Sequence, residues 1–196
     1  MDTGMTRLTA TAFLMLMLGI GAALAMAADQ AADTAKKATP TYVGSKACKV
    51  CHMGEKKGKM WEIWSASKHA SSLAALDSAK GERSDPKCLK CHTTGYGVGG
   101  YGAEGKAEMT APDVLGSVGC EDCHGPGSEY KNMKVMKDRQ ASIEAGLIIP
   151  DENTCKKCHN EESPTFKGFK FDEYWAKIAH KLPPPAEVEP APQGGK

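Results

Sequence analysis

Eight cysteines occur in four pairs, and two residues separate the members of each pair. Four of the six histidines directly follow the second cysteine of a pair. The resulting C-x-x-C-H units are Cys48, Cys51 and His52; Cys88, Cys91 and His92; Cys120, Cys123 and His124; and Cys155, Cys158 and His159. This spacing is the attachment signature of c-type haem, in which two thiols bond to the porphyrin and the adjacent imidazole binds the iron. The sequence therefore predicts four covalently bound haem c groups.

Disulfide bonds and zinc sites are the alternatives for so many cysteines. An exported chain with an even number of cysteines is typical of a disulfide framework, and C-x-x-C pairs can converge on zinc. Neither alternative explains why every pair carries its own adjacent histidine. We therefore favour haem attachment.

His69 and His180 are the two histidines outside these motifs. Both occur among apolar residues, where a buried core histidine is the ordinary interpretation. Four irons with one imidazole each still need ligands on the opposite side, and neutral imidazole is a common metal ligand. We expect both histidines to bind haem iron.

The composition leaves little material for an ordinary core. The chain has 196 residues and a net charge of +1, with 41% hydrophobic but only 6% aromatic residues. The balanced charge does not favour nucleic-acid binding. Four macrocycles would themselves fill much of the interior, so we expect the apoprotein to be largely unfolded.

The chain is expected to have four parts. An apolar run over residues 12–25 follows Arg7 and ends at Ala25-Met26-Ala27, a pattern typical of a signal peptide cleaved after residue 27. A retained anchor is the alternative, although the run is shorter than the ~20 residues that span a bilayer. Residues 28–41 are predicted to form a flexible leader, 42–182 a tetrahaem domain and 183–196 a disordered proline-rich tail. We expect a periplasmic protein with no transmembrane segment after cleavage.

Apolar spacing predicts helices over residues 58–77, 128–145 and 172–181, and the attachment motifs are expected on helices as well. No convincing alternating run occurs, so the predicted fold is mainly α and loop-rich, built around the haems. Gly97, Gly99 and Gly102 match a dinucleotide-binding pattern, but no apolar strand precedes them. We expect the glycine-rich stretch 93–105 to pass closely over a haem edge and to leave a channel there.

The residues flanking the motifs resemble the tetrahaem cytochrome c-554 (cytochrome c-554/c-prime) family. The resemblance covers residues 42–181 and includes Tyr42-Val43-Gly44, the segment 64–70 around His69, the stretch 118–127 and the segment 158–180. It implies a helical, loop-rich domain with closely packed haem pairs that carries electrons between periplasmic redox proteins. It also implies that His69 binds the third haem, that His180 binds the fourth, and that the second haem, held by His92, is five-coordinate.

The chain departs from this family after the third motif, where the family has a further histidine that binds the first haem. Here the region contains Tyr130, Met133 and Met136 but no histidine. We predict Met133 as the sixth ligand opposite His52, with Met136 as the second choice. Core packing of the methionines and a Tyr130 ligand are the alternatives.

Three functions are compatible with these patterns. An electron carrier between redox proteins, with no substrate of its own, is favoured over an enzyme. Binding or reduction of nitric oxide, or of another small nitrogen compound, at an open haem is the second, although no acid/base cluster is recognisable. The third is a haem polymer, but six histidines per chain cannot supply two ligands to each of four haems however subunits exchange them.

Overall fold

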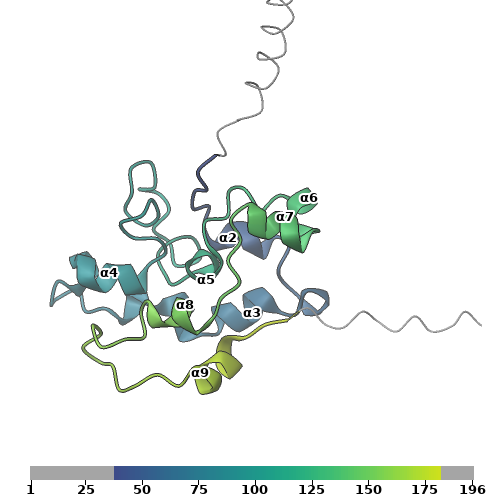
Figure 1. Cartoon of the computed structure of the whole chain (residues 1–196). Coiled ribbons are helices and arrows are strands. Elements are labelled where there is room, and N and C mark those ends of the chain that lie inside the picture. The colour runs from purple at the N-terminus through teal and green to yellow at the C-terminus, as the bar shows by residue number, and fades with distance from the viewer. Residues whose placement is uncertain (1–37, 182–196) are drawn as a thin grey trace, which may run out of the picture. The chain divides into compact units, whose positions relative to one another are not determined.

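The computed structural model describes residues 38–181, and all its regular elements in that range are helical. The α-helices are α2 (Ser45–Lys49), α3 (Met60–Ser65), α4 (Pro86–His92), α5 (Cys120–His124), α6 (Met133–Met136), α7 (Arg139–Glu144), α8 (Glu152–Lys156) and α9 (Phe171–Ile178) (Figure 1). Four 3-10 helices are η1 (Glu55–Lys57), η2 (Lys68–Ser71), η3 (Leu73–Ala75) and η4 (Glu82–Ser84). No strand occurs within this range, so the predicted mainly α, loop-rich fold is confirmed.

The helix expected over residues 58–77 is interrupted. Helix α3 ends at Ser65, and the chain continues through η2 and η3. The break lies at Ser67, whose backbone is extended and whose hydroxyl donates to the Trp64 carbonyl at 2.6 Å. A side chain that hydrogen-bonds the nearby backbone competes with helix propagation in this way.

The helix expected over residues 128–145 is also shorter than predicted and is divided into α6 and α7. The side chain of Asn132 accepts from the Lys134 N–H and begins α6. That of Asp138 accepts from the Ala141 N–H and begins α7, so an N-cap lies in the middle of the predicted helix. The third expected helix is present as α9, which ends at Ile178, a few residues before the prolines.

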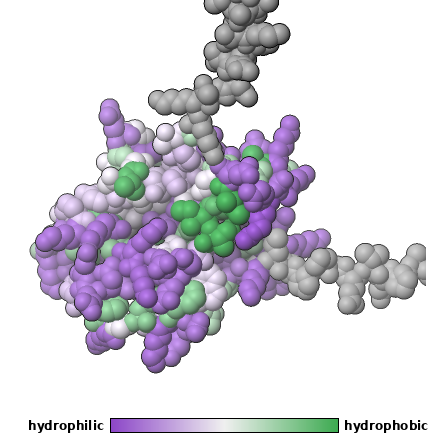
Figure 2. All heavy atoms as spheres, in the orientation of Figure 1, coloured by the Kyte–Doolittle hydropathy of each residue, from purple (hydrophilic) through white to green (hydrophobic). Residues whose placement is uncertain are grey.

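The interior contains few apolar side chains. Of the described residues, the buried hydrophobic ones are Trp64, Leu76, Leu89, Leu115 and Tyr130. Several large apolar side chains are instead exposed, and an apolar patch lies on an otherwise largely polar face (Figure 2). A chain of this length normally buries a larger apolar core, so the described residues alone supply less apolar burial than such a fold usually has.

The expected signal peptide, most of the leader and the tail lie outside the described residues. Between residues 38 and 181, no helix is long and apolar enough to span a membrane.

Candidate haem-binding sites

Each C-x-x-C-H motif forms one helical turn. The second and third motifs lie on α4 and α5, and the first and fourth begin on α2 and α8. In the first motif, the His52 N–H donates to the Cys48 carbonyl at 3.0 Å, and the fourth motif has the same bond between His159 and Cys155. Residues spaced three and four apart share a helix face, so each turn presents two thiols and one imidazole together. All eight thiols are free.

Thiols of different motifs also meet. The Cys48 thiol is hydrogen-bonded to that of Cys120, and this bond, together with burial, raises the pKa of Cys48. The first motif is therefore adjacent to the third, as expected from the packing of α2 against α5.

The second and fourth motifs meet in the same way. Burial, followed by the charge and the hydrogen bond of the Cys91 thiol, raises the pKa of Cys158 to about 12. Burial, then the charges of Asp122 and Cys155, raises the pKa of Cys123 to about 12, which places the third motif near the fourth. The thiol contacts thus follow the order first, third, fourth, second.

A small polar junction joins three of the motifs. The Cys120 N–H donates to the Ser45 hydroxyl at 3.0 Å, and the Gly119 N–H donates to the Thr94 hydroxyl at 2.9 Å. The Thr94 hydroxyl also lies 2.8 Å from the carboxylate of Asp122. Burial raises the pKa of Asp122 to about 6, against the hydrogen bonds that lower it. A Cβ on Gly119 would lie 2.3 Å from the Ser45 hydroxyl oxygen, so only glycine fits this junction.

The buried carboxylate of Glu121 fixes the chain on either side of the third motif. It accepts from the N–H groups of Val43 and Gly44, at 2.9 and 2.7 Å, and from that of Gly127 at 2.7 Å. Glu121 is 2% exposed. This residue therefore holds the segment before the first motif against the loop after the third.

His180 faces the proximal histidine of the third motif. The ring centroids of His124 and His180 are 6.0 Å apart, and the ring planes are inclined by 55°. The Nδ1 atoms of both rings contact backbone carbonyls, of Ile148 and Ile178 respectively, each at 3.1 Å. The opposite ring nitrogen, Nε2, is thereby left for a metal on both histidines.

His69 faces the proximal histidine of the fourth motif. The ring centroids of His69 and His159 are also 6.0 Å apart, with ring planes inclined by 60°. Phe169 stacks on His159 at 4.9 Å, and the His69 carbonyl accepts from the Val118 N–H. These contacts hold the two imidazoles in position.

The 6.0 Å separation fits two axial imidazoles on one iron. Two metal–nitrogen bonds of about 2 Å each, with roughly 1 Å from each nitrogen to its ring centre, separate the centroids by about 6 Å. The residues present therefore fit the haem groups that the motifs imply. The pairing implied by the family resemblance is reversed, because His180 lies beside the third motif and His69 beside the fourth.

Burial also favours the metal-binding form of these rings. It is the largest cause lowering the pKa values of His52, His69, His124 and His159. A lowered pKa keeps imidazole neutral near pH 7, and only neutral imidazole offers a lone pair to a metal.

The first and second motifs have no comparable partner. All six histidines lie within residues 38–181, and neither His52 nor His92 forms a ring contact with another imidazole there.

Met133, predicted opposite His52, is 63% exposed at the start of α6. The sulfur of Met136 lies 3.8 Å from the Ser142 hydroxyl. The buried Tyr130 hydroxyl donates to the Gly125 carbonyl, which disfavours it as a ligand.

The thioether that lies beside His52 is that of Met60, which the sequence did not single out. Its Sδ is 3.1 Å from His52 Nδ1. Only the return of the chain after the first motif brings the two together, so no local spacing rule indicates the contact.

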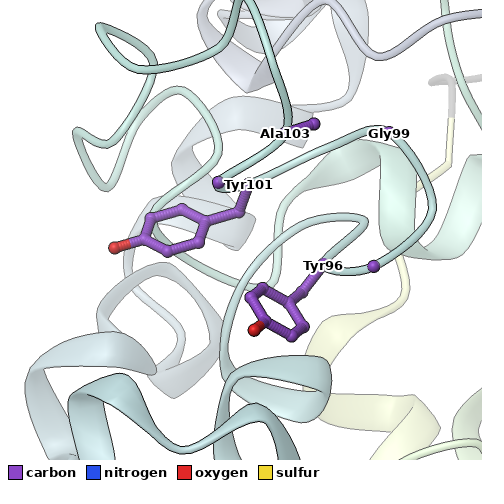
Figure 3. A pocket seen from close by; sticks show the side chains of 6 residues that line it. Tyr96, Gly99, Tyr101 and Ala103 are labelled. Atoms are coloured by element: carbon purple, nitrogen blue, oxygen red, sulfur yellow. The ribbon is translucent and has the colours of Figure 1, made fainter.

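The glycine-rich stretch after the second motif forms a loop closed by its own backbone. The Tyr101 N–H donates to the Thr94 carbonyl at 2.8 Å and the Gly100 N–H to the Gly95 carbonyl at 2.9 Å. A hollow of about 300 Å³ lies against this loop and is lined by Tyr96, Tyr101, Ala103 and three glycines (Figure 3). The expected passage of this loop over a haem edge stays a prediction.

Four helical turns that present paired thiols and an imidazole, with two further imidazoles opposite, define the chain as a c-type cytochrome. The family described as "Cytochrome c554 and c-prime" matches residues 47–125, which contain the first three motifs. Cytochrome c-554 of Nitrosomonas europaea is 32% identical over 154 residues. Both matches are to the cytochrome c-554 family, which the residues flanking the motifs resemble.

The match to the Nitrosomonas protein covers 66% of this chain and 62% of the relative. No solved structure matches the chain.

Proposed function

We propose that this chain is a periplasmic tetrahaem cytochrome that transfers electrons between redox partner proteins. The observation that carries the proposal is the pair of imidazole contacts at 6.0 Å, His124 with His180 and His69 with His159. Each cysteine pair would attach one haem, and the adjacent histidine would bind its iron. When bound, haem supplies a reversible one-electron couple.

The residues around the third and fourth motifs support a carrier rather than a catalyst. If both imidazoles of a pair bind one iron, that iron would have no position for a substrate. The backbone and aromatic contacts of these rings resist movement, so little reorganisation would accompany a change of charge. The adjacency of the motifs supports a route in the order first, third, fourth, second.

The first experiment is the intact mass of the exported protein after acid extraction of free haem. We expect the polypeptide beginning after Ala27 plus four covalently attached haem groups. Disulfide-bonded or zinc-bound protein without haem would contradict the proposal.

A second candidate function is the binding of a small molecule, such as nitric oxide, at the second motif. The observation that favours it is His92, which has no imidazole opposite. Its Nδ1 lies 2.7 Å from the Ser72 carbonyl, a contact that would hold the ring in place with Nε2 toward the iron.

Carbon monoxide added to the reduced holoprotein tests this candidate. Binding by one haem, lost when Cys88 and Cys91 are replaced with serine so that the second motif cannot attach haem, would support an open second site. No optical change on adding the gas would contradict it.

A further inference from the structure

The imidazole Nδ1 of the first motif has another kind of hydrogen-bond acceptor beside it than the imidazoles of the second and third motifs have. His92 and His124 have a backbone carbonyl oxygen at Nδ1, whereas His52 has the Met60 sulfur at 3.1 Å. With the iron on the other ring nitrogen, Nδ1 carries the hydrogen and donates it. The first motif is therefore supported by a thioether, which is a weak acceptor.

The chain between the two residues is shaped to make this contact. Residues 54–59 turn back so that the Trp61 N–H donates to the His52 carbonyl at 2.9 Å. Gly58 and Lys59 both adopt left-handed conformations, and Lys59 is the one non-glycine residue between 38 and 181 with a positive φ, of 51°. A strained residue persists where the surrounding structure holds it.

Two side-chain contacts secure the turn. The Glu62 carboxylate accepts from the Gly54 N–H at 2.9 Å, and Lys59 pairs with Glu55 at 2.9 Å. The loop 54–59, closed by these backbone and side-chain bonds, thus places Met60 beside His52.

The strength of this acceptor affects the iron. A strong acceptor at Nδ1 makes imidazole a better electron donor, which favours the oxidised metal, and such outer contacts tune metal sites. We propose that Met60 is a positioning residue that orients His52 and, as a weak acceptor, sets the first haem at a higher potential than a carbonyl acceptor would. This inference rests on the proposed function, because it requires haem at the first motif.

Two substitutions at Met60 separate acceptor strength from packing. Met60→Gln provides a strong amide acceptor of similar length, and Met60→Leu keeps the apolar bulk but removes the acceptor. Met60 is half-buried, so both side chains can be accommodated. Potentiometric titration of the holoprotein, followed by optical and paramagnetic NMR spectra, measures the four potentials. We expect Met60→Gln to lower one potential and Met60→Leu to leave the same potential equal to or above that of the parent.

Met53→Gln is the matched control, because it adds the same amide beside the first motif at a side chain that is 48% exposed. We expect no shift. Four unchanged potentials in fully loaded Met60→Gln, or an equal shift in Met53→Gln, would overturn the role of Met60. The intact mass of each protein separates this result from a failure of the proposed function. A parent protein with fewer than four haems contradicts the proposed function, whereas unchanged potentials in fully loaded Met60→Gln contradict only the role of Met60.

Discussion

At the scale of single residues, the four proximal histidines and the two distal ones differ in how far the sequence predicts them. A proximal histidine is adjacent to its cysteines, so one helical turn defines its role. His69 and His180 lie close to their partners only because segments distant in the sequence pack together. The Val118 N–H donates to the His69 carbonyl, and His180 follows directly after α9. Counting ligands can therefore predict that they bind iron, whereas their pairing requires the fold.

His180→Ala should convert the haem of the third motif from low-spin to high-spin, and His69→Ala should do the same at the fourth. Each change removes one imidazole of a 6.0 Å pair. Electron paramagnetic resonance of the oxidised proteins measures the spin states, and intact mass should still show four haems. If each variant instead affected the other motif's haem, the pairing seen here would be wrong.

The sixth ligand of the first haem is a separate prediction. If Met133 binds opposite His52, the oxidised protein has a weak sulfur-to-iron band at long wavelength, and Met133→Ala abolishes it. The same substitution lowers one reduction potential, because thioether sulfur favours ferrous iron. Met136→Ala is the comparison. Absence of the band in the parent protein would exclude methionine ligation.

At the scale of elements, capping residues decide where the helices break. Apolar spacing indicates that helices occur near residues 60–75 and 133–144, but it does not detect the competition from Ser67, Asn132 and Asp138. Hydrogen bonds between these side chains and the nearby backbone are local, and Asn and Asp are favoured N-cap residues, so the sequence does contain a signal for the division.

Replacing Glu121, which joins the segment before α2 to the loop after α5, should lower the free energy of unfolding. Glu121→Gln turns one acceptor oxygen into an N–H donor that faces backbone N–H groups, so buried donors lose their partner. We expect a loss of about 2 kcal/mol in the free energy of unfolding, measured by guanidinium denaturation of the holoprotein. Glu104→Gln, at an exposed carboxylate, should change it little. Equal effects of the two substitutions would exclude the role of Glu121.

At the scale of the whole molecule, the small apolar core implies that bound haem supplies much of the stability. The third motif contacts both the first and the fourth, whereas the second lies at the end of the order. Replacing Cys120 and Cys123 with serine should therefore reduce stability more than the same change at Cys88 and Cys91. Thermal denaturation and protease resistance of the three-haem proteins measure the difference, and similar losses would contradict a central position of the third motif.

The contact between the thiols of Cys48 and Cys120, and that between Cys91 and Cys158, carries a consequence for biosynthesis. Each contact joins a cysteine of one motif to a cysteine of another, so loss of two electrons and two protons to an oxidant would form a cross-link that spoils both attachment sites. An exported chain that closed before receiving its cofactors would be open to this reaction in an oxidising compartment. If the chain is exported and loaded as proposed, haem attachment would therefore have to precede its final closure, while the thiols are reduced and still far apart.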